Sequence, residues 1–222
     1  MLILALDTTT SAGSCALVGD GRVVREEASD RGRPQAARLP GELAALIERT
    51  GVALAAVDAF AVGIGPGSFT GLRVGIATMQ GLAMATGKPL FGISALDALA
   101  RVVAAPRVAT WVDAWRGEVY AALYENGREV EPPTVEPPQA VLGRLIDRPP
   151  VFAGDGAEIY QSIIRATLGD RTRLHDPIVP LLAGAMGTLA TEAWEAGRRP
   201  TPDAIRPLYV RRPDAELARD RA

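Results

Sequence analysis

The residues with the clearest chemical potential form a glycine-rich segment that runs from position 63 to position 83. An apolar strand is expected over residues 57–63, and a helix is expected to begin near Ser68, a residue type that caps helices well. Glycines at a strand-to-helix junction let the backbone come close to a phosphate, another helix or another chain. The role of this segment therefore depends on which of the three approaches it.

The glycine spacing argues against a phosphate site. Gly65, Gly67 and Gly71 follow the pattern G-x-G-x-x-x-G, which is one residue off the dinucleotide-binding fingerprint. Pro66 has no N–H to donate to a phosphate, and no acidic residue follows about 20 positions later. The run at 81–88 resembles a Walker loop, but a proline stands where Ser or Thr must hold magnesium. Neither phosphate motif is complete.

The helix that follows has two apolar faces, each of which could pack within its own domain or against a partner subunit. Glycine and threonine on one face let another helix come unusually close. Burial within its own lobe and packing on a partner subunit both remain open; a partner surface on this helix would be formed by Leu72, Arg73, Gly75, Ile76, Met79, Gln80, Leu82 and Ala83. On this hypothesis Gly75→Arg or Met79→Glu removes partner binding and leaves the fold intact.

Polar residues follow the first strand of each half of the chain. The run 7–11 offers five consecutive side-chain oxygens, and Asp113 stands at the matching place in the second half. In a sugar-kinase-like lobe such a turn approaches nucleotide phosphates and its Asp helps to hold the metal. The other interpretation is that the hydroxyls cap backbone groups of the turn. The residues of a possible vestigial nucleotide site are Asp7, Thr8, Thr9, Asp113, Gly154, Asp155 and Gly156.

Composition limits the remaining possibilities. His175 is the only histidine, which excludes a multi-histidine metal site, and no G-x-S-x-G elbow occurs. Cys15 is the only cysteine, so we expect a buried, inert thiol and no intrachain disulfide. A net charge of −2 gives no basic field for nucleic acid. Without a signal peptide or a membrane-spanning run, we expect a cytoplasmic protein.

The elements that position these residues occur in two similar series, each reading strand-strand-strand, helix, strand, helix. In the first half, strands are expected at 2–6, 14–18, 22–28, 57–63 and 90–93, with helices at 35–49, 68–86 and from 94 onward. In the second half, strands are expected at 107–113, 118–124, 128–131 and 151–153, with helices at 139–146, 158–168 and 181–197.

This repeated pattern predicts an α/β fold of two similar lobes, each with a mixed sheet and flanking helices. We expect the first lobe over residues 1–104 and the second over 105–198, with the helix at 181–197 completing the second. Residues 199–222 are expected to return to the first lobe.

Several runs resemble the TsaB (YeaZ) family, the dimerisation subunit of the bacterial tRNA threonylcarbamoyladenosine complex. They are spread along nearly the whole chain, at 4–11, 65–77, 81–83, 113–120 and 207–211. The resemblance implies an actin/Hsp70-like (ribonuclease H-like) duplicated fold. It also implies a likeness to the catalytic subunit TsaD, which binds a metal through histidines. The corresponding run at 31–38 contains no histidine here.

The resemblance implies a non-catalytic partner of TsaD, in a ternary complex with TsaE, that supports transfer of threonylcarbamoyl to the tRNA adenosine beside the anticodon. The chain alone would form a homodimer and would meet tRNA only through the complex. It would need no metal or cofactor of its own, although ATP or ADP could lie at the complex interface. Two alternatives remain at this point: an ATP-binding and ATP-hydrolysing enzyme of the same fold, and a peptidase that acts on TsaD.

Overall fold

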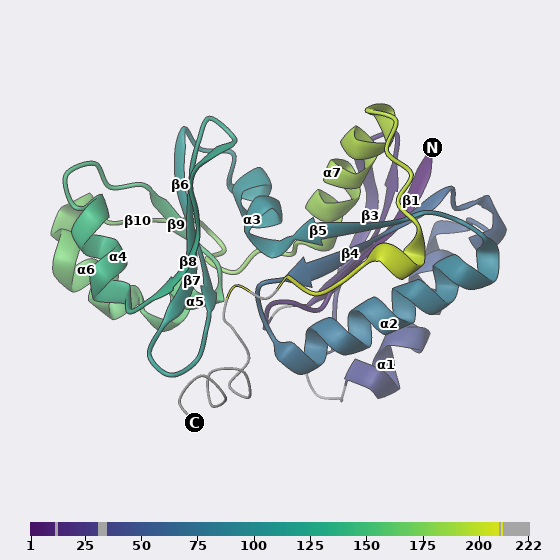
Figure 1. The fold of residues 1–222 in the computed structure, drawn as a ribbon, viewed down its shortest axis with the longest axis horizontal. Coiled ribbons are helices and arrows are strands. Elements are labelled where there is room, and N and C mark those ends of the chain that lie inside the picture. Colours follow the sequence, from purple (N-terminus) through teal and green to yellow (C-terminus); the bar gives the residue numbers. More distant parts are fainter. Residues whose placement is uncertain (12, 31–34, 209, 211–222) are drawn as a thin grey trace, which may run out of the picture.

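The computed structural model describes residues 1–11, 13–30, 35–208 and 210, which form two lobes (Figure 1). The first lobe contains β1 (Leu2–Asp7), β2 (Ser14–Gly19), β3 (Arg22–Ala28), α1 (Gln35–Thr50), β4 (Ala59–Gly65), α2 (Phe69–Thr86), β5 (Leu90–Ser94) and α3 (Ala95–Val103). The second contains β6 (Arg107–Asp113), β7 (Val119–Glu125), β8 (Arg128–Glu136), α4 (Pro138–Leu145), β9 (Val151–Ala153), α5 (Asp155–Ile159), α6 (Gln161–Leu168) and β10 (Arg173–Leu174). After these come α7 (Ala183–Glu195) and, along the chain, three short 3-10 turns: Leu54–Ala56, Gly169–Arg171 and Pro202–Ala204.

The two sheets have the same topology, which confirms the predicted duplication. The strand orders are β3-β2-β1-β4-β5 in the first sheet and β8-β7-β6-β9-β10 in the second. In each, a central strand pairs antiparallel with its hairpin partner and parallel with the strand that follows a helix. The two hairpin turns that follow β1 and β6 therefore occupy equivalent places in their lobes.

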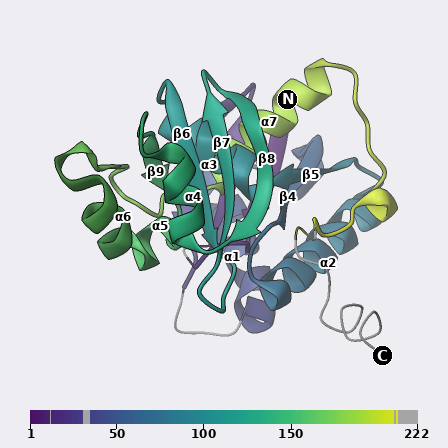
Figure 2. The same cartoon turned by 60° about the vertical axis from the view of Figure 1, so that its left-hand side comes forward.

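The first sheet is covered on both faces, and side chains that alternate along β1 divide between two cores. Leu4 and Leu6 belong to the core that includes residues of α1 and α2. Ile3 and Ala5 belong to the core that includes Ala183 of α7. Figures 1 and 2 show α1 and α2 together on one side of the first lobe and α7 on the other.

The position of α7 corrects one prediction. This helix was expected to complete the second lobe, but it contacts all five strands of the first sheet. Its N-terminus is held there by β2 and β3, because Ser14 Oγ accepts the amides of Leu182 and Ala183 and Glu26 accepts the amide of Gly184. These caps join residues more than 150 positions apart, so the local sequence pattern does not reveal them.

Two other elements differ from the prediction. β8 was expected to end at Glu131 but continues to Glu136, through Pro132 and Pro133. It is an edge strand whose register with β7 shifts in this region, and edges and bulges are where a strand tolerates proline. The helix expected over 158–168 is divided at Tyr160 into α5 and α6.

The chain after α7 runs back along the first lobe. Pro200 O accepts the amide of Leu90, and Leu208 donates its amide to Ile64 O. The residues from 211 onward, which were expected to continue this return, lie outside the described part of the structure. Within the described residues, every helix is too short or too polar to cross a membrane.

Candidate functional site

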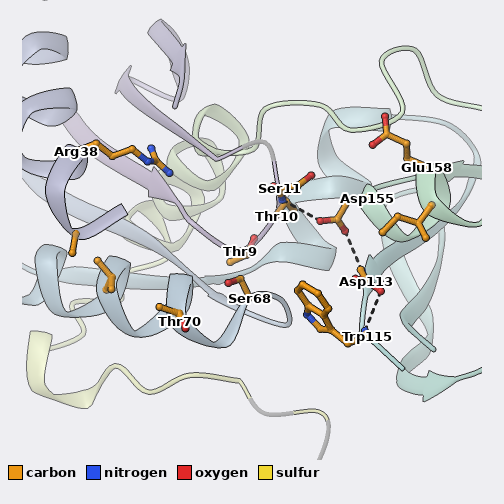
Figure 3. Close-up of a pocket in the computed structure, with 13 residues that line it drawn as sticks. Thr9, Thr10, Ser11, Arg38, Ser68, Thr70, Asp113, Trp115, Asp155 and Glu158 are labelled. Atoms are coloured by element: carbon orange, nitrogen blue, oxygen red, sulfur yellow. Dashed lines mark hydrogen bonds between the residues drawn. The ribbon is translucent and has the colours of Figure 1, made fainter. Parts of the chain in front are cut away.

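A cleft of about 880 Å³ lies between the two lobes (Figure 3). The hairpin turns after β1 and β6 and the starts of α2 and α5 contribute to its walls. Its lining residues are Thr9, Thr10, Ser11, Ala36, Arg38, Ser68, Thr70, Val74, Asp113, Trp115, Asp155, Glu158 and Ile159. Three residues of the predicted nucleotide site are among them: Thr9, Asp113 and Asp155.

Asp7 does not reach the cleft. Its side chain is fully buried, and its Oδ1 accepts the amide and the hydroxyl of Thr9 at 2.8 and 2.6 Å. Its Oδ2 accepts the Thr10 hydroxyl at 3.1 Å. Burial raises the pKa of this carboxyl, and the three hydrogen bonds oppose that shift. Asp7 was expected to face a nucleotide, but its carboxylate makes hydrogen bonds within its own turn instead.

The glycine-rich segment is approached by the same turn. Thr8 donates its hydroxyl to Gly71 O at 2.8 Å, and a Cβ added at Gly75 would overlap Thr8 Oγ1. A Cβ added at Gly67 would likewise overlap the carbonyl of Thr9. These glycines let the β1–β2 turn pack on the start of α2, so the close approach is made within one lobe.

This packing also corrects the predicted partner surface. Leu72, Ile76, Met79 and Ala83 are buried in the core of the first lobe, as is Gly75. They form the face of α2 that packs on the sheet, so they present no free surface to a second protein. The Gln80 side chain donates to the carbonyls of Pro202 and Ile205. Of the eight residues, Arg73 is exposed and Leu82 is half-buried.

The exposed face of α2 is the one that carries Ala77 and Gly81, next to the buried face of Ile76. Ala77 and Gly81 are exposed, and a Cβ added at Gly81 would meet nothing within 4 Å. Together with α1 they border a largely apolar groove of about 680 Å³. We call this surface the α1–α2 groove; it is lined by Leu4, Pro40, Leu43, Ala44, Ile47, Glu48, Leu54, Ala77, Thr78, Gly81 and Leu82.

A sequence signal for this groove exists on α1. Leu39, Leu43 and Leu46 are buried in the core, but Pro40, Ala44 and Ile47 lie beside them and extend the apolar arc beyond what the core covers. An apolar arc wider than the core-facing stripe indicates a second contact surface. The glycines of α2 are the more conspicuous sequence feature, and the arc on α1 was not predicted.

The second lobe presents carboxylates to the cleft. Asp113 Oδ1 accepts the amide of Trp115 at 3.0 Å, and the indole is 67% exposed at the cleft wall. Asp155 is buried and accepts backbone amides, while Glu158 on the next turn of α5 is exposed. Burial raises the pKa of Asp155, and its amide hydrogen bonds oppose the rise. The carboxyl groups of Asp113, Asp155 and Glu158 together make this wall of the cleft acidic.

The balance of charge in the cleft does not favour a polyphosphate. Among the lining residues that the structure describes, Arg38 is the one cation, and its guanidinium binds both carboxylate oxygens of Glu42 at 2.9 and 2.7 Å. Within the described residues, no three His, Cys, Asp or Glu side chains are grouped to hold a metal. His175 lies after β10, where its Nδ1 is 2.8 Å from Pro177 O. The described lining of the cleft therefore carries three carboxyl groups, those of Asp113, Asp155 and Glu158, and one arginine that is already paired.

Similarity to known proteins shows which family the chain belongs to. A family model described as TsaD, tRNA N6-adenosine threonylcarbamoyltransferase, matches residues 23–216. The tRNA threonylcarbamoyladenosine biosynthesis protein TsaB of Escherichia coli is 34% identical over 225 residues, covering 95% of each chain. The structure of YeaZ from Pseudomonas aeruginosa has a TM-score of 0.74 and 33% identity, covering 94% of this chain and 99% of that one.

A more distant likeness concerns the fold alone. The activator of 2-hydroxyisocaproyl-CoA dehydratase from Clostridium difficile, solved with bound ADPNP, has a TM-score of 0.56 at 15% identity, over 89% of this chain and 97% of that one. The two duplicated sheets with flanking helices define an actin/Hsp70-like α/β protein. The chain belongs to the TsaB (YeaZ) family, within the wider family that the threonylcarbamoyltransferase model describes. The resemblance found in its motifs is confirmed.

Proposed function

We propose that this chain is a non-catalytic partner subunit in tRNA threonylcarbamoyladenosine biosynthesis and that it binds TsaD through the α1–α2 groove. The observation that carries the proposal is the open groove between α1 and α2, because its mostly apolar lining is left uncovered by the core and offers a concave surface that a partner can bury. Full-length similarity to a protein named for this pathway supports the choice of pathway.

The shape of the groove suits a pair of helices from the partner. Ala77 and Gly81 lie one helical turn apart on α2 and carry little or no side chain, so a helix can pack close to the backbone. TsaD shares the fold, since its family model matches most of this chain, and it would present an equivalent helix pair. A second copy of this chain presents the same face, so a homodimer would form when TsaD is absent.

The remaining parts of the proposal concern the complex. TsaE would join it, tRNA would be contacted only through it, and ATP or ADP would bind at a subunit interface. This chain would need no cofactor of its own and would act in the cytoplasm. The buried state of Asp7 and the pairing of Arg38 with Glu42 support a role without catalysis. The same two observations disfavour the ATP-hydrolysing alternative.

A reconstituted modification assay tests the proposal. With TsaD, TsaE, tRNA and the threonylcarbamoyl donor present, we expect product formation to fall at least about 100-fold when this chain is omitted. Asp113→Asn and Glu158→Gln, which change a half-buried and an exposed carboxylate of the cleft, should retain activity within about twofold. A variant that binds TsaD normally but abolishes product formation would assign catalysis to this chain and overturn the proposal.

Two further measurements separate the alternatives. Calorimetry of the isolated chain with ATP and Mg²⁺ should give no binding heat; a stoichiometric complex would favour the ATP-dependent enzyme. Mass spectrometry of TsaD after incubation with this chain should show an intact polypeptide; a defined cleavage would favour the peptidase.

A further inference from the structure

One carboxylate joins the two hairpin turns across the cleft. Asp155 Oδ2 accepts the amide of Ser11, which follows β1 in the first lobe, at 3.1 Å. Its Oδ1 accepts the amide of Asp113, at the end of β6 in the second lobe, at 3.0 Å. Figure 3 shows this chain of contacts running from Ser11 through Asp155 to Asp113. A single side chain therefore joins the first hairpin turn to the end of β6 across the seam between the lobes.

The backbone around Asp155 is built to place it there. Gly154 has φ 106°, and a Cβ at this position would overlap the carbonyl of Trp111 in β6. A Cβ at Gly156 would lie 3.0 Å from the carbonyl carbon of Val112. The start of α5 therefore crosses the end of β6 at close range, and the residue between the two glycines faces the seam between the lobes.

The surroundings of Asp155 disfavour the charged form of its carboxyl group. Asp155 is 7% exposed; burial raises the pKa of its carboxyl, and the nearby Asp113 carboxylate raises that pKa further. Backbone amides of Ser11, Asp113 and Gly156 offset that penalty by donating to the charged form. Backbone amides that converge in this way are the groups that proteins use to bind small anions. Here the bound anion is the side chain of Asp155 itself.

We propose that Asp155 is an interlobe latch, an internal anion that fixes the closure of the two lobes by binding an amide from each. The Ser11 amide is thereby already engaged and is not free to bind an anion from solution. This inference goes beyond the proposed function, because it concerns the seam between the lobes and does not depend on TsaD or on the α1–α2 groove.

Amide exchange measured by NMR on the chain alone tests the latch. Asp155→Asn keeps the size of the side chain but places an NH₂ group against one of the two amides, and Asp155→Ala removes both acceptors. We expect exchange at Ser11 to become at least about tenfold faster in the alanine variant, and exchange at Asp113 likewise. Glu158→Gln, which changes another cleft carboxylate on α5, should leave both rates as in the wild type.

Formate provides a second, gain-of-function readout. Because it carries the missing carboxylate, formate should slow exchange of both amides in Asp155→Ala and raise its melting temperature, with no effect on the wild type. Unchanged exchange at Ser11 in both Asp155 variants would overturn the proposal, even with faster exchange at Asp113, because the contact would then act within the second lobe alone. If Asp155→Ala does not fold, the asparagine variant carries the test.

Discussion

The two long faces of α2 carry the same kinds of residue but serve different purposes. On the inner face, a Cβ at Gly75 would overlap Thr8 of the first hairpin turn. On the outer face, a Cβ at Gly81 would meet nothing within 4 Å. A glycine therefore does not by itself indicate which neighbour comes close. Its position around the helix decides whether it lies against the same lobe or on a surface that a partner can reach.

The largest expected effect on the fold comes from placing a charge on each face. Met79 is fully buried, so Met79→Glu should lower the free energy of unfolding by about 4 kcal/mol or more, because a carboxylate would be desolvated without a partner. Ala77→Glu places the same group on the outer face and should change stability by less than about 0.5 kcal/mol. Urea denaturation of both variants measures the difference. Equal stabilities would contradict the assignment of the faces.

This expectation replaces the one drawn from the sequence, in which Gly75→Arg and Met79→Glu would spare the fold. Both positions are buried, so both variants should lose TsaD binding through unfolding. Circular dichroism before any binding experiment would reveal this.

A gentler pair of substitutions sharpens the same comparison. Gly75→Ala should lower the free energy of unfolding by about 1–3 kcal/mol, because Thr8 must move to make room. Gly81→Ala should raise it by about 1 kcal/mol, because alanine favours the helix and meets open space. Thermal unfolding of the two variants gives opposite shifts on this account. Shifts of the same sign would mean that both glycines face similar surroundings.

A last effect, which is absent at neutral pH and grows only in alkali, reports on the core beneath α1 and α2. Cys15 belongs to that core, and burial raises the pKa of its thiol from 9.0 to about 12. The unfolded chain ionises first as the pH rises, so the thiol's contribution to stability is complete below pH 9 and is lost toward pH 12.

The stability advantage of the wild type over Cys15→Ala should therefore shrink by up to about 1.4 kcal/mol per pH unit in this range. Denaturant unfolding of both proteins at several pH values measures it. At pH 8 iodoacetamide should label Cys15 only after unfolding. Rapid labelling of the native chain would show that this core is open.

The sequence predicted the order of elements and the duplication well, because strand alternation and helix periodicity are local signals. It did not predict which face of α2 is buried, since the deciding contact joins Thr8 to Gly71, 63 positions away. The placement of α7 depends in the same way on the distant caps Ser14 and Glu26. Of the candidate nucleotide residues, Thr9, Asp113 and Asp155 line the cleft, but the sequence did not reveal the burial of Asp7.

The central proposal is that the outer face of α2 binds TsaD, and calorimetric titration of TsaD with two matched variants tests it most directly. Gly81→Arg fills the α1–α2 groove, whereas Gly143→Arg makes the same change at an exposed, unobstructed glycine of α4 in the second lobe. The account predicts at least about 100-fold weaker binding for Gly81→Arg, or about 2.7 kcal/mol, and wild-type affinity for Gly143→Arg. Wild-type affinity for folded Gly81→Arg would contradict it.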